Sequence, residues 1–194
     1  MEEALEVWKK GDTVLEIHQD DRQSPDSREW DNLGIMLCGH GSYTLGDEQF
    51  NDRESLDQRL KELDPVIKLP LWLMDHSGLW MQTGEFDSDA QHWDSGQVGW
   101  IVATKKDILD KIYPEQRPTP SWSSMIKNAE QILRGEVETY SKDLSGEVYG
   151  YVIKKVNTCA KCQNESFDNI DSCWGFYSHD DIWNYVGKKG WVQQ

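Results

Sequence analysis

Two groups of residues in this chain have the types and spacing that site chemistry requires. The first is the pair Cys159-x-x-Cys162, because two thiolates at this spacing chelate one zinc ion from a turn. A closed zinc site needs two further ligands, and Cys173 is the nearest donor along the predicted hairpin. The sequence therefore predicts a structural zinc bound by Cys159, Cys162 and Cys173, with the fourth ligand left open. The alternative is a pair of free thiols on a loop.

The second group consists of Asp75, His76, His92 and Asp94. Such side chains bind a divalent metal, or act as a base and its orienting partner in hydrolysis. Their spacings match no mechanistic motif, whether HExxH, a nucleophile elbow or a phosphate-binding glycine loop. Short polar residues next to glycine are also ordinary turn sequences. We favour the hypothesis that the protein is not an enzyme. The alternative is a small metal-dependent hydrolase or nuclease that uses these four residues.

Two short apolar runs frame these Asp and His residues. Residues 69–74 and 98–103 are bounded by Gly, Asp or Pro and predict buried strands. The connection at 84–97 is acidic and contains no Lys or Arg. It is more typical of a contact surface than of a catalytic one, since Trp is common among residues that dominate binding energy. The predicted binding residues are Glu85, Asp87, Asp89, Trp93 and Asp94, together with Trp30.

The remaining periodicity predicts an α+β fold. Apolar residues at helical spacing predict two main helices, over 52–63 and 121–144. Residues 1–11 predict a frayed helical turn. Further strands are predicted at 33–38, 147–156 and 170–177. We expect one twisted antiparallel sheet of about five to seven strands, with both helices packed on one face.

The length of 194 residues suits one domain with a substantial core. We therefore expect a single domain over residues 1–194. Within it, a Pro-rich bend is predicted at 114–120 and a zinc-knuckle hairpin loop at 157–169.

The chain is strongly acidic, with a formal net charge of −15 and a pI near 4.6. Direct binding of nucleic acid is not expected, because phosphate contacts need clustered Lys and Arg. An ordered acidic surface can instead imitate nucleic acid toward a protein with a basic groove. No apolar run is long enough to span a bilayer, and the acidic N-terminus lacks the features of a signal peptide. A protein of the host cell cytosol, with no membrane partner, is expected.

Several longer motifs carry a resemblance to a known family. They are Arg28-Glu-Trp-Asp-Asn-Leu-Gly34, Asp75-His-Ser-Gly78, Trp93-Asp-Ser-Gly-Gln-Val-Gly-Trp100, Gly135-Glu-Val-Glu-Thr-Tyr140, Gly146-Glu-Val-Tyr-Gly150 and Asp171-Ser-Cys-Trp-Gly-Phe-Tyr177. With these motifs the chain resembles small uncharacterised proteins carried by bacteriophages, plasmids and other mobile elements, mainly of Firmicutes and gut bacteria. The resemblance implies an accessory protein that blunts host defences, of the anti-CRISPR or anti-restriction type.

These observations leave three hypotheses. The first is an acidic inhibitor that imitates nucleic acid and binds a nucleic-acid-handling defence nuclease of the host. The second is the metal-dependent hydrolase described above. The third is a zinc-stabilised accessory protein whose partner has no role in defence.

Overall fold

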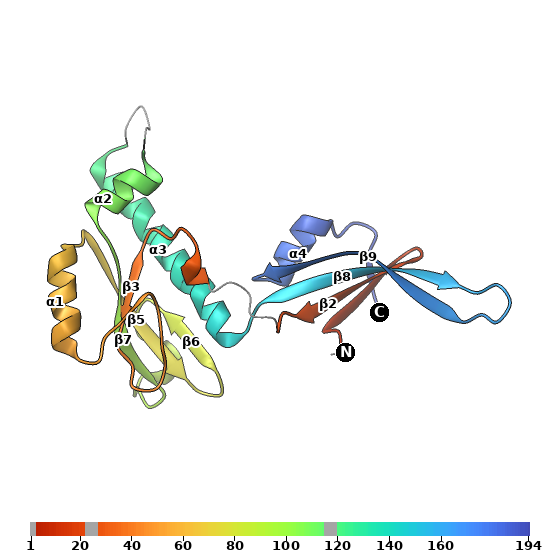
Figure 1. Cartoon of the computed structure of the whole chain (residues 1–194), viewed down its shortest axis with the longest axis horizontal. Coiled ribbons are helices and arrows are strands. Elements are labelled where there is room, and N and C mark those ends of the chain that lie inside the picture. Colours follow the sequence, from red (N-terminus) through yellow and green to blue (C-terminus); the bar gives the residue numbers. More distant parts are fainter. Residues whose placement is uncertain (1–2, 22–26, 115–119) are drawn as a thin grey trace. The chain divides into compact units, whose positions relative to one another are not determined.

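The computed structural model describes residues 3–21, 27–114 and 120–194, so most of the Pro-rich bend predicted at 114–120 lies outside the described residues. The mixed α+β class is confirmed. The chain divides into two compact units, unit 1 (Met1–Ser24 with Gly146–Gln194) and unit 2 (Pro25–Ser145). Each has its own five-stranded sheet (Figure 1). The sequence predicted one sheet in a single domain, whereas the structure has two sheets in two compact units.

Unit 2 contains the acidic connection and the Asp and His residues. The strand order in its sheet is β4-β3-β7-β5-β6, with β3 and β4 parallel and the other pairs antiparallel. The strands are β3 (Ile35–Cys38), β4 (Glu48–Gln49), β5 (Ile67–Asp75), β6 (Leu79–Gln82) and β7 (Ser95–Ala103). The two predicted apolar runs are thus the adjacent strands β5 and β7. Together they form the middle of the sheet.

Two helices cover opposite faces of this sheet (Figure 1). Helix α1 (Arg53–Leu63) packs Leu56 and Leu60 against Val102 on one face. Helix α3 (Trp122–Ser145) packs Leu133 with Ile101 on the other. The prediction that both helices lie on one face is wrong for this sheet. Its central strands are buried on both sides, so successive residues of β7 face different helices.

The ends of these helices follow their sequence signals. Asp52 caps α1 by accepting the backbone N–H of Ser55 at 2.8 Å. After β7, Thr104 and Asp107 form a capping box that starts the short helix α2 (Lys105–Asp107), which continues as a π-helical turn over Ile108–Ile112. Further short turns lie at Ser27–Glu29 and Asp87–Asp89.

Strands β3 and β7 approach each other especially closely at Gly99. A Cβ atom at Gly99 would lie 1.9 Å from the carbonyl oxygen of Leu37. Only glycine fits there without moving backbone. The pairing continues past the end of β3, where the Gly39 N–H donates to the Val98 carbonyl at 2.8 Å.

Unit 1 is an antiparallel sheet in the order β10-β1-β2-β8-β9. The strands are β1 (Glu6–Lys10), β2 (Thr13–Gln19), β8 (Tyr149–Thr158), β9 (Glu165–Phe176) and β10 (Val192–Gln193). Helix α4 (His179–Val186) packs Ile182 and Trp183 onto Leu15, Ile17 and Tyr151. The predicted helical turn at residues 1–11 is replaced by β1, whose pairing with β2 gives it its hydrogen bonds.

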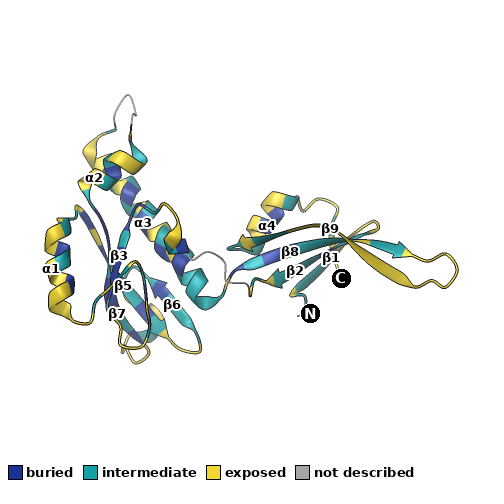
Figure 2. Cartoon of the chain, viewed as in Figure 1, coloured by how far each residue is buried: buried dark blue, intermediate teal, exposed yellow. Residues whose placement is uncertain are grey.

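Strands β8 and β9 extend past the rest of this sheet as a two-stranded ribbon. The last residue of β8 that pairs with β2 is Lys155, opposite Thr13, whereas β8 and β9 pair as far as Thr158 and Glu165. The loop that joins them is therefore residues 159–164, shorter than the predicted 157–169. Figure 2 shows the outer part of β9 exposed.

Candidate functional site

The connection between β6 and β7, residues 84–94, is the best-defined candidate site, and we call it the acidic loop. Its backbone is held by Asp89, whose carboxylate accepts the N–H groups of Trp93 at 3.1 Å and Asp94 at 2.9 Å. His92 adopts a left-handed conformation with φ of 53°. Gln82 adds a hydrogen bond of 2.6 Å from its side-chain amide to the Glu85 carbonyl. The loop is therefore ordered before any partner arrives.

The pKa of Asp89 reflects the same hydrogen bonds that order the loop backbone. Burial alone raises the pKa of Asp89, but hydrogen bonds from the backbone N–H groups of Asp94 and Trp93 outweigh it, so the pKa is lowered overall. Glu85 and Asp87 lie on the same loop, and Glu85 pairs loosely with His92 at 3.7 Å. Asp89 is thus ionised at neutral pH and holds the loop as a carboxylate.

Trp93 projects from this ordered loop into solvent. Its side chain is 82% exposed, and its indole N–H donates to the side-chain oxygen of Gln91 at 2.8 Å. The neighbouring Trp72 behaves differently, because it is half-buried and contacts the His92 ring in a tilted arrangement with ring centroids 5.0 Å apart. Exposing a Trp forgoes several kcal/mol of burial, on the order of 2–3 kcal/mol. An indole presented on a fixed loop is a feature of recognition surfaces.

The predicted Asp and His group is partly assembled beside the acidic loop. The His76 imidazole lies 3.0 Å from the Asp94 carboxylate, and the Asp75 N–H donates to the Asp94 carbonyl at 2.8 Å. The Tyr43 hydroxyl donates to the Asp75 carboxylate at 2.7 Å, and this bond raises the pKa of Tyr43. His92 is turned away, toward Trp72 and Glu85.

The histidines of this group have different carboxylate partners, since His76 pairs with Asp94 and His92 with Glu85. His76 and Asp94 have side chains 69% and 49% exposed, so water competes for their hydrogen bonds. In the described part of the chain, no three or more His, Cys, Asp or Glu residues come together in a way that could hold a metal ion. These contacts form a surface network at the base of the acidic loop.

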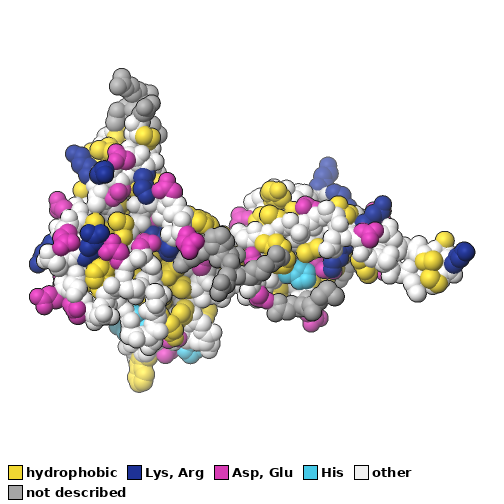
Figure 3. Space-filling view, viewed as in Figure 1, with side chains coloured by type: hydrophobic (Ala, Val, Ile, Leu, Met, Phe, Trp, Pro, Cys, Tyr) yellow, Lys and Arg dark blue, Asp and Glu magenta, His cyan; other side chains and the backbone are white. Residues whose placement is uncertain are grey.

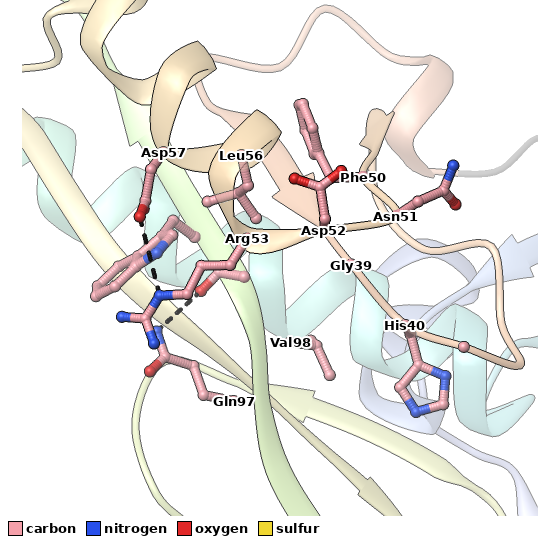
Figure 4. A pocket seen from close by; sticks show the side chains of 13 residues that line it. Gly39, His40, Phe50, Asn51, Asp52, Arg53, Leu56, Asp57, Gln97 and Val98 are labelled. Atoms are coloured by element: carbon pink, nitrogen blue, oxygen red, sulfur yellow. Dashed lines mark hydrogen bonds and ion pairs between the residues drawn. The ribbon is translucent and has the colours of Figure 1, made fainter.

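A pocket next to this network was not predicted from the sequence. Its volume is about 410 Å³, and it lies between the start of α1 and the strand β7 (Figure 4). His40 lies at the pocket and stacks on Tyr43 at 5.0 Å, which links it to Asp75 and the acidic loop. Arg53 and Asp57 form an ion pair of 3.9 Å across one side. The Gly39-His40-Gly41 turn is the sequence signal that marks this position.

Trp30 does not belong to the surface around Trp93. It precedes β3, whose first residue Ile35 pairs with Val102, near the end of β7. The adjacent Asp31 pairs with Lys111, which follows β7, at 3.0 Å. Trp93 instead precedes the first residue of β7. The nine residues of β7 place its two ends roughly 25–30 Å apart at about 3.3 Å per residue, and the two Trp residues belong to opposite ends.

The four cysteines are free thiols in different environments. Burial raises the pKa of Cys38 to about 12. Cys159 and Cys162 are exposed at the end of the β8–β9 ribbon. The pKa of Cys159 is lowered because the backbone N–H groups of Cys162 and Lys161 donate to its sulfur.

Cys173 lies far from this pair. It is opposite Tyr151, seven residues along β8 from Thr158, which is roughly 23 Å at about 3.3 Å per residue. A zinc–sulfur bond is only about 2.3 Å long. The prediction that Cys173 shares one ion with Cys159 and Cys162 of the same chain therefore fails on strand register.

No family model matches this chain, and comparisons with curated proteins and with solved structures also give no match. The resemblance to proteins of mobile elements stays a prediction. Within the described residues, no helix combines the length and apolar character needed to cross a membrane.

Proposed function

We propose that this chain is a binding protein that inhibits a nucleic-acid-handling protein of the host, and that the acidic loop is its contact surface. The observation that carries the proposal is the 82% exposure of Trp93 on a loop fixed by Asp89. Fixing a loop in advance reduces the ordering cost of association. A rigid, exposed indole then supplies apolar contact area at little further entropic cost.

The charge around Trp93 indicates the kind of partner. The loop carries Glu85, Asp87, Asp89 and Asp94 and no Lys or Arg. Carboxylates at this density attract a basic surface and repel polyanions. Grooves that hold DNA or RNA are basic for the same reason. The best-fitting partner is a nuclease of a defence system, with Trp93 entering an apolar recess beside its basic groove.

The distribution of charge on the rest of unit 2 indicates how much of its surface imitates nucleic acid. On the face shown in Figure 3, Lys and Arg side chains are interspersed with Asp and Glu. Mimicry is therefore proposed for the acidic loop and its immediate surroundings, rather than for the whole surface. A local contact of this kind occupies part of a groove and blocks entry of the nucleic acid.

The test is affinity capture with the immobilised full chain from a lysate of a candidate host. The proposal predicts a captured nucleic-acid-binding protein that is released by duplex DNA and by raised salt. Trp93→Ala is expected to abolish capture. Trp30→Ala is the matched control, because it removes another exposed Trp, 50% exposed, at the opposite end of the β7 strand.

Three outcomes would contradict the proposal. One is a captured protein that neither duplex DNA nor salt releases. Another is equal capture by Trp93→Ala and the unaltered chain. The third is loss of capture with Trp30→Ala alone.

A further inference from the structure

The end of the β8–β9 ribbon carries the two cysteines in a geometry suited to a metal. The Cys159 carbonyl accepts the N–H of Gln163 at 2.9 Å, and the Cys159 N–H donates to the Asn164 carbonyl at 2.9 Å, which closes a tight turn. Cys159 and Cys162 both lie on this turn, and both are exposed. Two thiolates at this spacing on a turn chelate one zinc ion. The turn is therefore one half of a tetrahedral zinc site.

The chain does not provide the other half nearby. Cys173 is roughly 23 Å away along the ladder at about 3.3 Å per residue, and Cys38 is buried in unit 2. No third His, Cys, Asp or Glu joins the pair among the residues described. Closed zinc sites take four protein ligands, commonly four cysteines. The Cys159–Cys162 turns of two copies of the chain together provide four cysteines.

We propose that Cys159 and Cys162 from two copies of this chain bind one zinc ion through four sulfur atoms, joining two ribbons end to end. Four zinc–sulfur bonds form, and the four thiol protons pass to solvent. The copies are related by a two-fold axis through the metal, so the same surface is used on both sides. This site is separate from the acidic loop and does not depend on the function proposed for it.

The position of the turn permits such a contact. Beyond Val156 the ribbon consists of two strands only, so no neighbouring strand stands between the turns of two copies. The loop 159–164 carries one charged residue, Lys161, in a chain of net charge −15. Figure 3 shows basic and hydrophobic side chains at this end of the ribbon. Two Lys side chains also offset the charge of −2 that one zinc ion and four thiolates carry.

The test uses the full chain, freed of metal and kept in a phosphine reductant that prevents disulfides. Zinc is added, and sedimentation velocity is combined with metal analysis. The expected result is a dimer with one zinc per two chains, which returns to monomer with a chelator. Cobalt in place of zinc is expected to give the absorption of tetrahedral four-sulfur coordination.

Variants separate this site from other arrangements. Cys159→Ser is expected to stay monomeric at saturating zinc, while Cys173→Ser, the matched control, dimerises like the unaltered chain. The inference is overturned by one zinc per monomer, by loss of zinc in Cys173→Ser, or by a monomer without bound zinc. A dimer that persists under chelator and reductant would also overturn it. Circular dichroism of each variant shows whether the fold is retained.

Discussion

Arg28 connects the start of β3 to helix α3 through a buried ion network. Its side chain is only 4% exposed. It donates to both carboxylate oxygens of Asp47, at 3.1 and 2.7 Å, to the Gly34 carbonyl at 2.8 Å and to Glu136 at 3.4 Å. Replacing it with Met keeps much of the aliphatic packing but removes the charge.

The expected cost follows from what remains after Arg28→Met. Breaking a buried ion pair by removing one partner costs about 3–5 kcal/mol, because the other charge stays buried without compensation. Glu136 still accepts the N–H groups of Leu33 at 2.6 Å and Gly34 at 3.1 Å, and Asp47 still accepts that of Met36 at 2.6 Å. We therefore expect the lower end, about 3 kcal/mol in the free energy of unfolding of unit 2.

The pH dependence gives this prediction a second readout. Burial already raises the pKa of Glu136, and Arg28 opposes that rise. Without Arg28 the folded-state pKa rises further above the unfolded value. A raised carboxyl pKa stabilises the fold below the unfolded pKa, and that contribution is lost as pH rises through the folded pKa. The cost of Arg28→Met is therefore expected to be smaller at pH 5 than at pH 8.

The assay is urea unfolding combined with hydrogen exchange of the α3 amides, at both pH values. Arg53→Met is the matched control, because Arg53 is 92% exposed and pairs with Asp57 at 3.9 Å. Exposed pairs contribute about 0–1 kcal/mol. Equal costs for the two variants, or a cost of Arg28→Met that is independent of pH, would refute this account of the network.

Two further predictions test the packing and the thiols. Gly99→Ala is expected to destabilise unit 2 by more than about 3 kcal/mol, since its Cβ meets backbone, whereas Gly96→Ala, with open space around it, should change the urea midpoint little. Alkylation at pH 8 followed by mass spectrometry should modify Cys159 and Cys162 rapidly and spare Cys38, whose pKa near 12 leaves almost no thiolate. Rapid labelling of Cys38 in the folded protein, or an unaffected midpoint in Gly99→Ala, would contradict these expectations.

The elements with strong periodicity could be predicted from the sequence. Helix α1 begins at Arg53 after its Asp52 cap, within one residue of the predicted start, and α3 covers Trp122–Ser145. The apolar runs within β5 and β7 were also identified. The structure of each of these segments can be predicted from local signals, namely the spacing of apolar residues and the helix-capping residues.

The arrangement of these elements could not be predicted in the same way. The pairing of β2 with β8, such as Ile17 with Tyr151, joins segments far apart in the chain and leaves no local signal. This pairing separates unit 1 from unit 2. The sequence did contain one signal that helices cover both faces of the unit 2 sheet. Consecutive apolar residues such as Ile101 and Val102 indicate a strand that is buried on both faces.

The candidate site was predicted in composition but only partly in geometry. The acidic loop and Trp93 follow from residue types between two strands. The sequence could not distinguish Trp30 from Trp93, because the exposure of a side chain and its position along the sheet depend on tertiary structure. Cys173 is near Cys162 in the sequence. However, β8 and β9 extend further toward the loop than predicted, and their register places Cys173 opposite Tyr151, away from the end of the ribbon.

The most direct test of the central claim is the affinity of the captured partner for the chain, measured by isothermal titration at low and at physiological salt. We expect Trp93→Ala to weaken binding by at least about 30-fold, the effect of a residue that contributes 2 kcal/mol or more. Binding of the unaltered chain should weaken as salt rises. An affinity that is the same for Trp93→Ala and insensitive to salt would show that the acidic loop is not the contact surface.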